Sequence, residues 1–207
     1  MTTSRTLDPV GGDATQRLAT SELCISSFGR TSRGCVRPAN EDAILVRPET
    51  GLWAVADGMG GHDAGEVASQ VVVDSLAGLM LRGSPYKRGQ QVEASIHSAN
   101  AEIRALASQR SIRRMGSTVA ALYIHDRHFA CMWAGDSRAY LLRNGRLQPI
   151  TRDHSVLQEV IDTGLVDELN AKRVYGANAI TRAVGIDEGL ELETAYGSVE
   201  AGDRFLL

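Results

Sequence analysis

Residues 52–61 read LWAVADGMGG. The first five are apolar and follow a turn-forming segment at residues 48–51, which predicts a strand over residues 52–56. Asp57 then places a carboxylate at the end of a buried strand, where it needs a partner, and a metal ion is the natural one. The glycines that follow allow the backbone to approach a ligand closely, and Gly58 offers its carbonyl oxygen. A glycine-rich turn that merely connects a strand to a helix is the alternative.

Two further acidic clusters lie beside predicted strands. Residues 37–42, RPANED, form a turn just before a strand at residues 43–47. An arginine next to two adjacent carboxylates could hold a phosphate and a hard metal ion. The alternative is a solvated charged turn, since most charged residues are simply exposed. In residues 133–138, WAGDSR, Asp136 follows another apolar strand. The alternative here is a tight turn in which the aspartate bonds its own backbone.

The surrounding sequence predicts a mixed α+β fold. Apolar residues recur at helical spacing over residues 65–81 and 91–108. Further strand patterns occupy residues 23–28, 117–124, 128–134, 138–143, 146–150, 190–196 and 204–207, with a short helix at 155–163 and a mobile flap or loop at 166–177. Asn144-Gly145 is a strong hairpin signal. Hairpins with two long helices inserted between them predict antiparallel sheets with helices packed outside.

Composition restricts the class of protein. A chain of 207 residues fits one domain, and we expect a flexible tail at residues 1–22 and a domain at 23–207. The net charge of -3 gives no electrostatic case for nucleic acid or an anionic membrane, and no apolar run is long enough to span a bilayer. The three cysteines lack CxxC spacing, which favours reduced thiols in the cytoplasm.

Taken together, the clusters are far more specific than any one of them. Their motifs are Arg37-x-x-Asn40-Glu41-Asp42, Asp57-Gly58-Met59-Gly60-Gly61, Gly116-Ser117-Thr118 and Gly135-Asp136-Ser137-Arg138. In order and spacing they resemble the type 2C (PPM) family of metal-dependent protein serine/threonine phosphatases. The segments TRDHS at 151–155 and ITRAVG at 180–185 are also similar, so the resemblance covers residues 24–207. The Asp-Gly-Met-Gly-Gly form resembles the bacterial branch, and within it the phosphatases that accompany type VI secretion systems.

The resemblance implies a four-layer α/β/β/α sandwich of two antiparallel sheets flanked by helices, with metals at one end. It implies two manganese or magnesium ions and a third, weaker site. The implied metal ligands are Glu41, Asp42, Asp57 as the bridge, the Gly58 carbonyl and, for the third ion, Asp136. Arg37 is expected to hold the substrate phosphate.

The implied reaction is hydrolysis of phosphoserine and phosphothreonine on proteins by an activated water, which reverses a Ser/Thr kinase. Arg37 and Asp57 are then the catalytic residues, and the enzyme is expected to be monomeric. A catalytically impaired protein of the same fold, which binds phosphoproteins or a signalling partner, is the alternative. An unrelated metal-binding protein would need four motifs to share the family order by coincidence.

Two departures from the family pattern stand out. Met59 occupies a position where some members have a histidine, and we interpret His62 as an exposed loop residue instead. The family also continues beyond a segment like residues 202–207 into another Asp-Gly and a further metal-binding Asp. We therefore expect a C-terminally truncated domain that lacks its last strands. Weak metal binding, feeble activity and association through the unpaired edge at 204–207 would follow.

Overall fold

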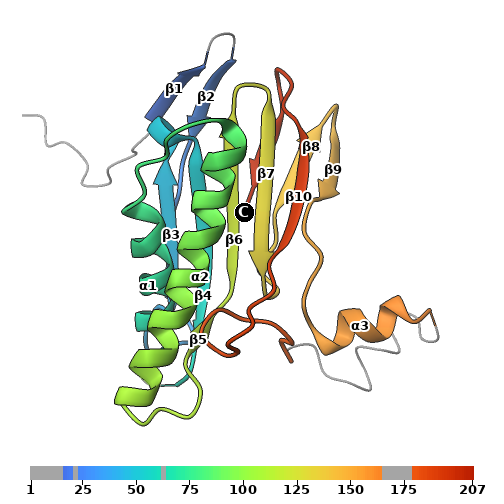
Figure 1. Ribbon diagram of the computed structural model, residues 1–207. Coiled ribbons are helices and arrows are strands. Elements are labelled where there is room, and N and C mark those ends of the chain that lie inside the picture. Colours follow the sequence, from blue (N-terminus) through green and yellow to red (C-terminus); the bar gives the residue numbers. More distant parts are fainter. Residues whose placement is uncertain (1–15, 21–22, 62–63, 165–178) are drawn as a thin grey trace, which may run out of the picture.

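A computed structural model describes residues 16–20, 23–61, 64–164 and 179–207 of the chain (Figure 1). The largest sheet is antiparallel, with strand order β10-β7-β6-β4-β3. Its strands are β3 (Asp42–Arg47), β4 (Leu52–Met59), β6 (Val119–His125), β7 (His128–Ala134) and β10 (Glu193–Ser198). The two-residue strand β5 (Gly116–Ser117) pairs with the last residues of β4. The short 3-10 helix η1 (Pro48–Thr50) joins β3 to β4.

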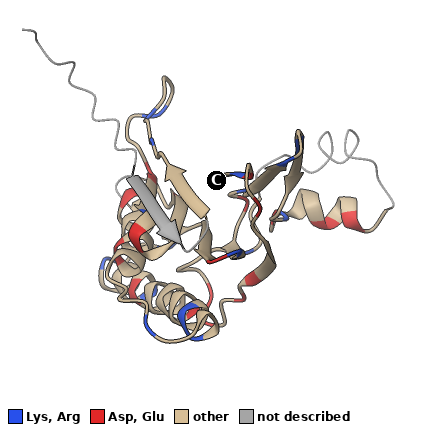
Figure 2. Ribbon diagram, turned by 90° about the horizontal axis from the view of Figure 1, so that it is seen from above, with Lys and Arg blue, Asp and Glu red and all other residues tan. Residues whose placement is uncertain are grey.

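Helices α1 (Ala64–Ala77) and α2 (Pro85–Gln109) lie on one face of this sheet, in front of β3, β4 and β6 in Figure 1. Seen from above, the two helices lie together on one side of the molecule, and acidic and basic positions are interspersed along them (Figure 2). Their apolar faces bury Val72, Leu76, Ile96 and Ile103 against the sheet. This packing forms the first of two hydrophobic cores.

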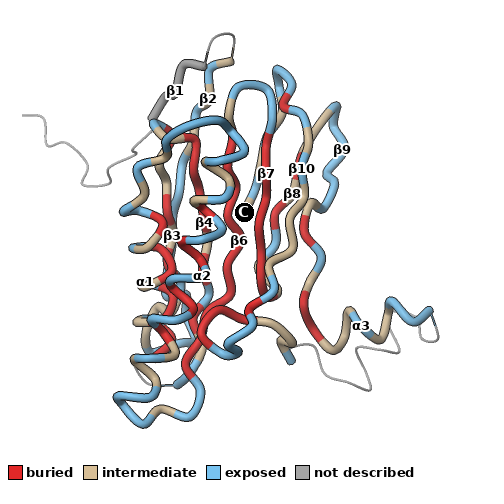
Figure 3. Tube along the Cα trace, in the orientation of Figure 1, coloured by how far each residue is buried: buried red, intermediate tan, exposed pale blue. Residues whose placement is uncertain are grey.

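The second core lies on the opposite face of the same sheet. A three-stranded sheet of β8 (Tyr140–Arg143), β9 (Arg146–Pro149) and β11 (Arg204–Leu206) contributes to it through Phe205. Strand β2 (Leu23–Ser27), which pairs with β1 (Gln16–Thr20), contributes Leu23 and Ile25. Successive residues of β6 alternate between the two cores, with Ala121 in the first and Leu122 in the second. The central strands are consequently buried on both faces (Figure 3).

The architecture confirms the predicted α+β class with two antiparallel sheets flanked by helices. The short helix α3 (Val156–Asp162) begins after Ser155, whose hydroxyl accepts the Gln158 N–H at 3.2 Å. The predicted hairpin turn is confirmed as well, because Asn144 and Gly145 have φ of 52° and 75°.

Several predicted boundaries were wrong. Strand β4 continues to Met59 instead of ending at residue 56, since β5 pairs with Gly58 and Met59. Helix α2 begins at Pro85 because Ser84 caps it, whereas apolar periodicity starts only at Val92. Pairing with β2 places residues 16–20 in a strand, although we assigned them to the tail.

Other predictions remain open. His62 and residues 166–177 lie outside the described residues, and the domain boundary at residue 23 stays a prediction. Among the helices that the structure describes, none is long and apolar enough to cross a membrane.

Candidate metal and phosphate site

Two aspartates face each other at the end of the main sheet. Asp42 on β3 and Asp57 on β4 are direct cross-strand partners in the antiparallel ladder. Trp53 packs in the second core, so strand alternation places Asp57, four residues later, on the same face of β4. Directly opposite residues have Cβ atoms about 5 Å apart, and like charges at such a pair destabilise a sheet. A positive charge close to both carboxylates would therefore stabilise the pair.

Close backbone packing surrounds this pair. The Gly58 N–H donates to the Glu41 carbonyl at 3.0 Å. A Cβ atom on Gly58 would overlap the Gly65 carbonyl, and one on Gly65 would lie 2.7 Å from the Glu41 carboxylate. The two glycines thus let the β4 backbone, the start of α1 and Glu41 meet, and no larger residue fits at either position.

Thr118, a fully buried residue between β5 and β6, fixes the backbone of Asp57. Its hydroxyl accepts the Asp57 N–H at 2.9 Å, and its own N–H donates to the Asp57 carbonyl at 2.9 Å. The hydroxyl also lies 2.6 Å from the Ser137 hydroxyl. Thr118 therefore connects Asp57 to the loop that carries Asp136.

That loop is held from two sides. Gly135 has φ of 108°, and a Cβ atom there would lie 2.6 Å from the Thr118 methyl group. Its N–H donates to Nδ1 of the buried His154 at 3.1 Å, and its carbonyl accepts the His154 N–H at 2.9 Å. Partial burial and the nearby Asp153 carboxylate raise the pKa of Asp136, an effect that Arg138 partly offsets.

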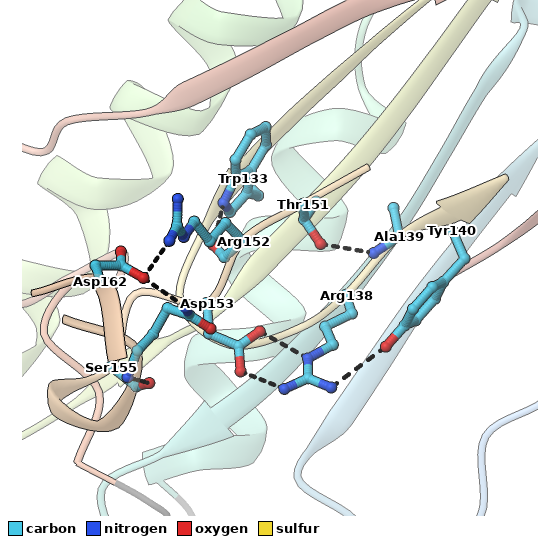
Figure 4. Close-up of polar contacts among 10 residues, drawn as sticks. Trp133, Arg138, Ala139, Tyr140, Thr151, Arg152, Asp153, Ser155 and Asp162 are labelled. Atoms are coloured by element: carbon cyan, nitrogen blue, oxygen red, sulfur yellow. Dashed lines mark hydrogen bonds and ion pairs between the residues drawn. The ribbon is translucent and has the colours of Figure 1, made fainter. Parts of the chain in front are cut away.

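A bidentate ion pair braces the outer side of the loop (Figure 4). Arg138 donates to both carboxylate oxygens of Asp153, at 2.7 and 2.6 Å, and to the Tyr140 hydroxyl at 3.3 Å. Thr151 accepts the Ala139 N–H at 2.9 Å. A bidentate pair of this kind fixes the relative orientation of the two side chains as well as stabilising them. We therefore assign Arg138 a structural role in holding the loop.

Four of the predicted site residues, Arg37, Glu41, Asp57 and Gly58, line one cleft of about 690 Å³, whereas Asp42 and Asp136 are not among its described lining. Its described lining includes Arg37, Glu41, Asp57, the backbone of residues 58–61 and Ile180. Asp57 is itself exposed to solvent. Partial desolvation by the cleft walls, followed by repulsion from Asp42, Asp136 and Glu41, raises the pKa of its carboxyl, and Arg37 opposes this effect.

The donor set fits a hard divalent cation. Asp42 and Asp57 supply two carboxylates, Gly58 supplies a carbonyl oxygen, and the open cleft admits water. Magnesium is usually bound through one or two carboxylates while it keeps several waters. Within residues 23–61, 64–164 and 179–207, no three His, Cys, Asp or Glu side chains are grouped tightly enough to enclose an ion by themselves. The arrangement therefore suits a partly hydrated ion.

Sequence reasoning missed the residues that hold this site. Thr118 and His154 lie in segments that resemble the family, yet we assigned no role to either. A threonine that directly follows Gly-Ser at the start of an apolar segment was the available sequence signal. The contact between His154 and Gly135 has no sequence signal, since 19 residues separate the two.

The family profile described as Protein phosphatase 2C matches residues 37–171, well over half of the chain. The chain belongs to the protein phosphatase 2C family. This match spans the clusters around Arg37, Asp57 and Asp136, so it confirms the resemblance noted in the sequence.

Similar proteins in this family come from bacteria. The serine/threonine protein phosphatase PstP of Mycobacterium tuberculosis is 35% identical over 191 residues, which are 92% of this chain and 37% of PstP. The chain thus spans less than half the length of that relative.

Two solved structures share the fold. PppA, a regulatory component of T6SS in Pseudomonas aeruginosa, superposes with a TM-score of 0.77 at 41% identity, over 85% of this chain and 73% of PppA. The PstP catalytic domain in complex with two manganese ions gives a TM-score of 0.71 at 34% identity, over 85% and 73% of the two chains.

Proposed function

We propose that this chain hydrolyses phosphoserine and phosphothreonine on proteins in a reaction that depends on manganese or magnesium. One observation carries the proposal: Asp57, the cross-strand partner of Asp42, lines an open cleft together with Arg37, and a bound cation there would relieve the repulsion between the carboxylates. Membership of the protein phosphatase 2C family supports it.

Asp57, Asp42, the Gly58 carbonyl and Glu41 would hold the two ions, and Asp136 would serve a third, weaker one. When bound, the ions supply a water of lowered pKa as the nucleophile and offset the charge on phosphate oxygens. Asp57 carries the main role because its backbone is fixed by Thr118 and its carboxyl is surrounded by three others. The related PstP catalytic domain was solved in complex with two manganese ions, which supports a site for two ions.

Arg37 is exposed at the cleft and has a guanidinium fork that matches two phosphate oxygens. We assign it to binding and orienting the phosphoryl group. Met59 lines the cleft and has no proton to donate, so we assign protonation of the leaving Ser or Thr alkoxide to water.

A phosphoprotein-binding role without turnover is the second candidate. The observation that favours it is the lack of three grouped ligand side chains in the described parts of the chain. The 41% identity to PppA supports an association with type VI secretion. The three free cysteines support a cytoplasmic, reducing environment, and we expect a monomer there.

Release of inorganic phosphate from a phosphothreonine peptide distinguishes these roles. With millimolar manganese the wild-type protein should release phosphate, with EDTA it should not, and Arg37→Ala should lower turnover while manganese binding stays close to wild type. Peptide binding without any manganese-dependent release would instead establish the binding role.

A further inference from the structure

A second pocket of about 490 Å³ adjoins the candidate active site. It shares Met59 and Ile180 with the cleft that contains Asp57. Four arginines line it: Arg104, Arg113, Arg114 and Arg182. No carboxylate belongs to its lining among the residues described. A concave surface with several cations and no anion attracts a negatively charged ligand.

Two of these arginines are free to bind such a ligand. Arg104 lies 3.6 Å from Glu188, and Arg182 lies 3.4 Å from Glu193, so both are partly neutralised. Arg113 and Arg114 are exposed and form no ion pair or side-chain hydrogen bond with any described residue. They occupy the loop between α2 and β5. Their charges are therefore available.

The loop with these two arginines is in direct contact with the glycine loop of the cleft. A Cβ atom on Gly60 would lie 2.6 Å from the Arg114 carbonyl oxygen. Met115, the next residue, is buried in the first core. Gly116 then pairs with Met59 in the short ladder between β5 and β4. The Arg113-Arg114 segment is thus anchored to the strand that carries Asp57.

The opposite wall of the pocket is also fixed. Ser117 and Val184 exchange backbone hydrogen bonds of 2.9 and 2.8 Å. The buried side chain of Asn100 accepts the Gly185 N–H at 2.6 Å and donates to the Asp187 carbonyl at 2.9 Å. Both walls are held by buried polar contacts, so the pocket is preformed, which reduces the entropic cost of binding.

We propose that this arginine pocket binds a second anionic group of the substrate, a phosphoryl or carboxylate group close in sequence to the phosphoresidue that is hydrolysed. The inference rests on the proposed function and specifies its substrate class: segments that are multiply phosphorylated or rich in Asp and Glu. A guanidinium forms bidentate, charge-assisted hydrogen bonds with either group.

Binding of fluorescent peptides, measured by anisotropy in EDTA, tests the pocket independently of turnover. One peptide carries a single phosphothreonine among neutral residues. Two series add either a phosphoserine or a glutamate at successive positions on either side. We expect the best doubly anionic peptide to bind about tenfold more tightly than the singly phosphorylated one, a preference that salt weakens. Preference for phosphoserine alone identifies a phosphoryl site, and an equal preference for glutamate identifies a general anion site.

The variant is Arg113→Gln combined with Arg114→Gln, which removes two charges and keeps polar side chains. The matched control is Arg146→Gln with Arg204→Gln, two exposed arginines on β9 and β11. The first variant should lose the preference and the control should keep it. A wild-type protein without preference, or a preference that survives in the first variant, would overturn the inference. Manganese-dependent hydrolysis of p-nitrophenyl phosphate, expected to be equal in all three proteins, reports separately on the proposed function.

Discussion

Replacing Asp57 by asparagine should stabilise the metal-free protein while it removes activity. Asp57 lies directly opposite Asp42, and the Asp136 and Glu41 carboxylates also raise its pKa. A like-charged cross-strand pair costs up to about 1 kcal/mol. Removing the charge should therefore increase the unfolding free energy by about 1 kcal/mol, which for a domain of this size raises the Tm by about 2–4 °C.

The charge of Asp57 makes the stability of the metal-free protein depend on pH in a defined direction. The raised pKa means that the folded protein retains this proton to higher pH than the unfolded chain, so ionisation of Asp57 lowers stability as the pH rises through the folded pKa. Below the pKa of the carboxyl in the unfolded chain, Asp57 is protonated in both the folded and the unfolded protein, and the loss of stability disappears. The stability difference between Asp57→Asn and wild type should consequently be greatest near neutral pH and should shrink as the pH falls.

The assay is thermal unfolding, monitored by circular dichroism. The control is Asp187→Asn, which removes the charge of an exposed aspartate outside the candidate site. In EDTA only Asp57→Asn should have a raised Tm. In manganese the wild type should instead have the higher Tm, because an ion present at a concentration of 100 times its Kd stabilises the protein that binds it by about 2.7 kcal/mol. A lowered Tm for Asp57→Asn in EDTA would show that the Asp57 charge does not destabilise the fold, and equal stabilisation of both proteins by manganese would show that Asp57 does not bind the ion.

Two other predictions follow from buried groups. Thr118→Val should destabilise the fold by about 1–3 kcal/mol, because the Asp57 N–H loses its hydrogen-bond partner. In urea unfolding, the midpoint of Thr118→Ser should lie closer to that of the wild type, because serine keeps the hydroxyl. Equal midpoints for the two variants would count against a stabilising role of this hydrogen bond. Burial raises the pKa of Cys131 to about 12, whereas Cys24 and Cys35 are exposed. Ellman's reagent at pH 8 should therefore modify two thiols rapidly and the third only after unfolding, and rapid modification of all three would show that Cys131 is accessible.

The sequence predicted those parts of the fold whose signals are local. Asn144-Gly145 specifies its turn, and Ser155 caps α3, because each depends on residues within one turn of itself. Strand β5 was not separated from β6, since a two-residue strand has no periodicity and exists only through its pairing with Gly58 and Met59. The bond from the Asp57 N–H to Thr118 spans 61 residues and was equally out of reach.

The candidate site also combines features with a local sequence signal and features that only the fold creates. Motif order identified the clusters around Arg37, Asp57 and Asp136, and the structure places them at one cleft or within electrostatic reach of it. The arginine pocket was not predicted, because Arg104, Arg113 and Arg182 belong to three separate segments that only the fold brings together.

We expect the Asp42–Asp57 end of the sheet to bind divalent metal ions. Anomalous diffraction at the manganese absorption edge, from crystals grown with manganese chloride, tests it most directly. We predict a peak in contact with an Asp57 carboxylate oxygen and the Gly58 carbonyl oxygen, and its loss in Asp57→Asn. Manganese bound only elsewhere, or a peak that persists unchanged in Asp57→Asn, would contradict it.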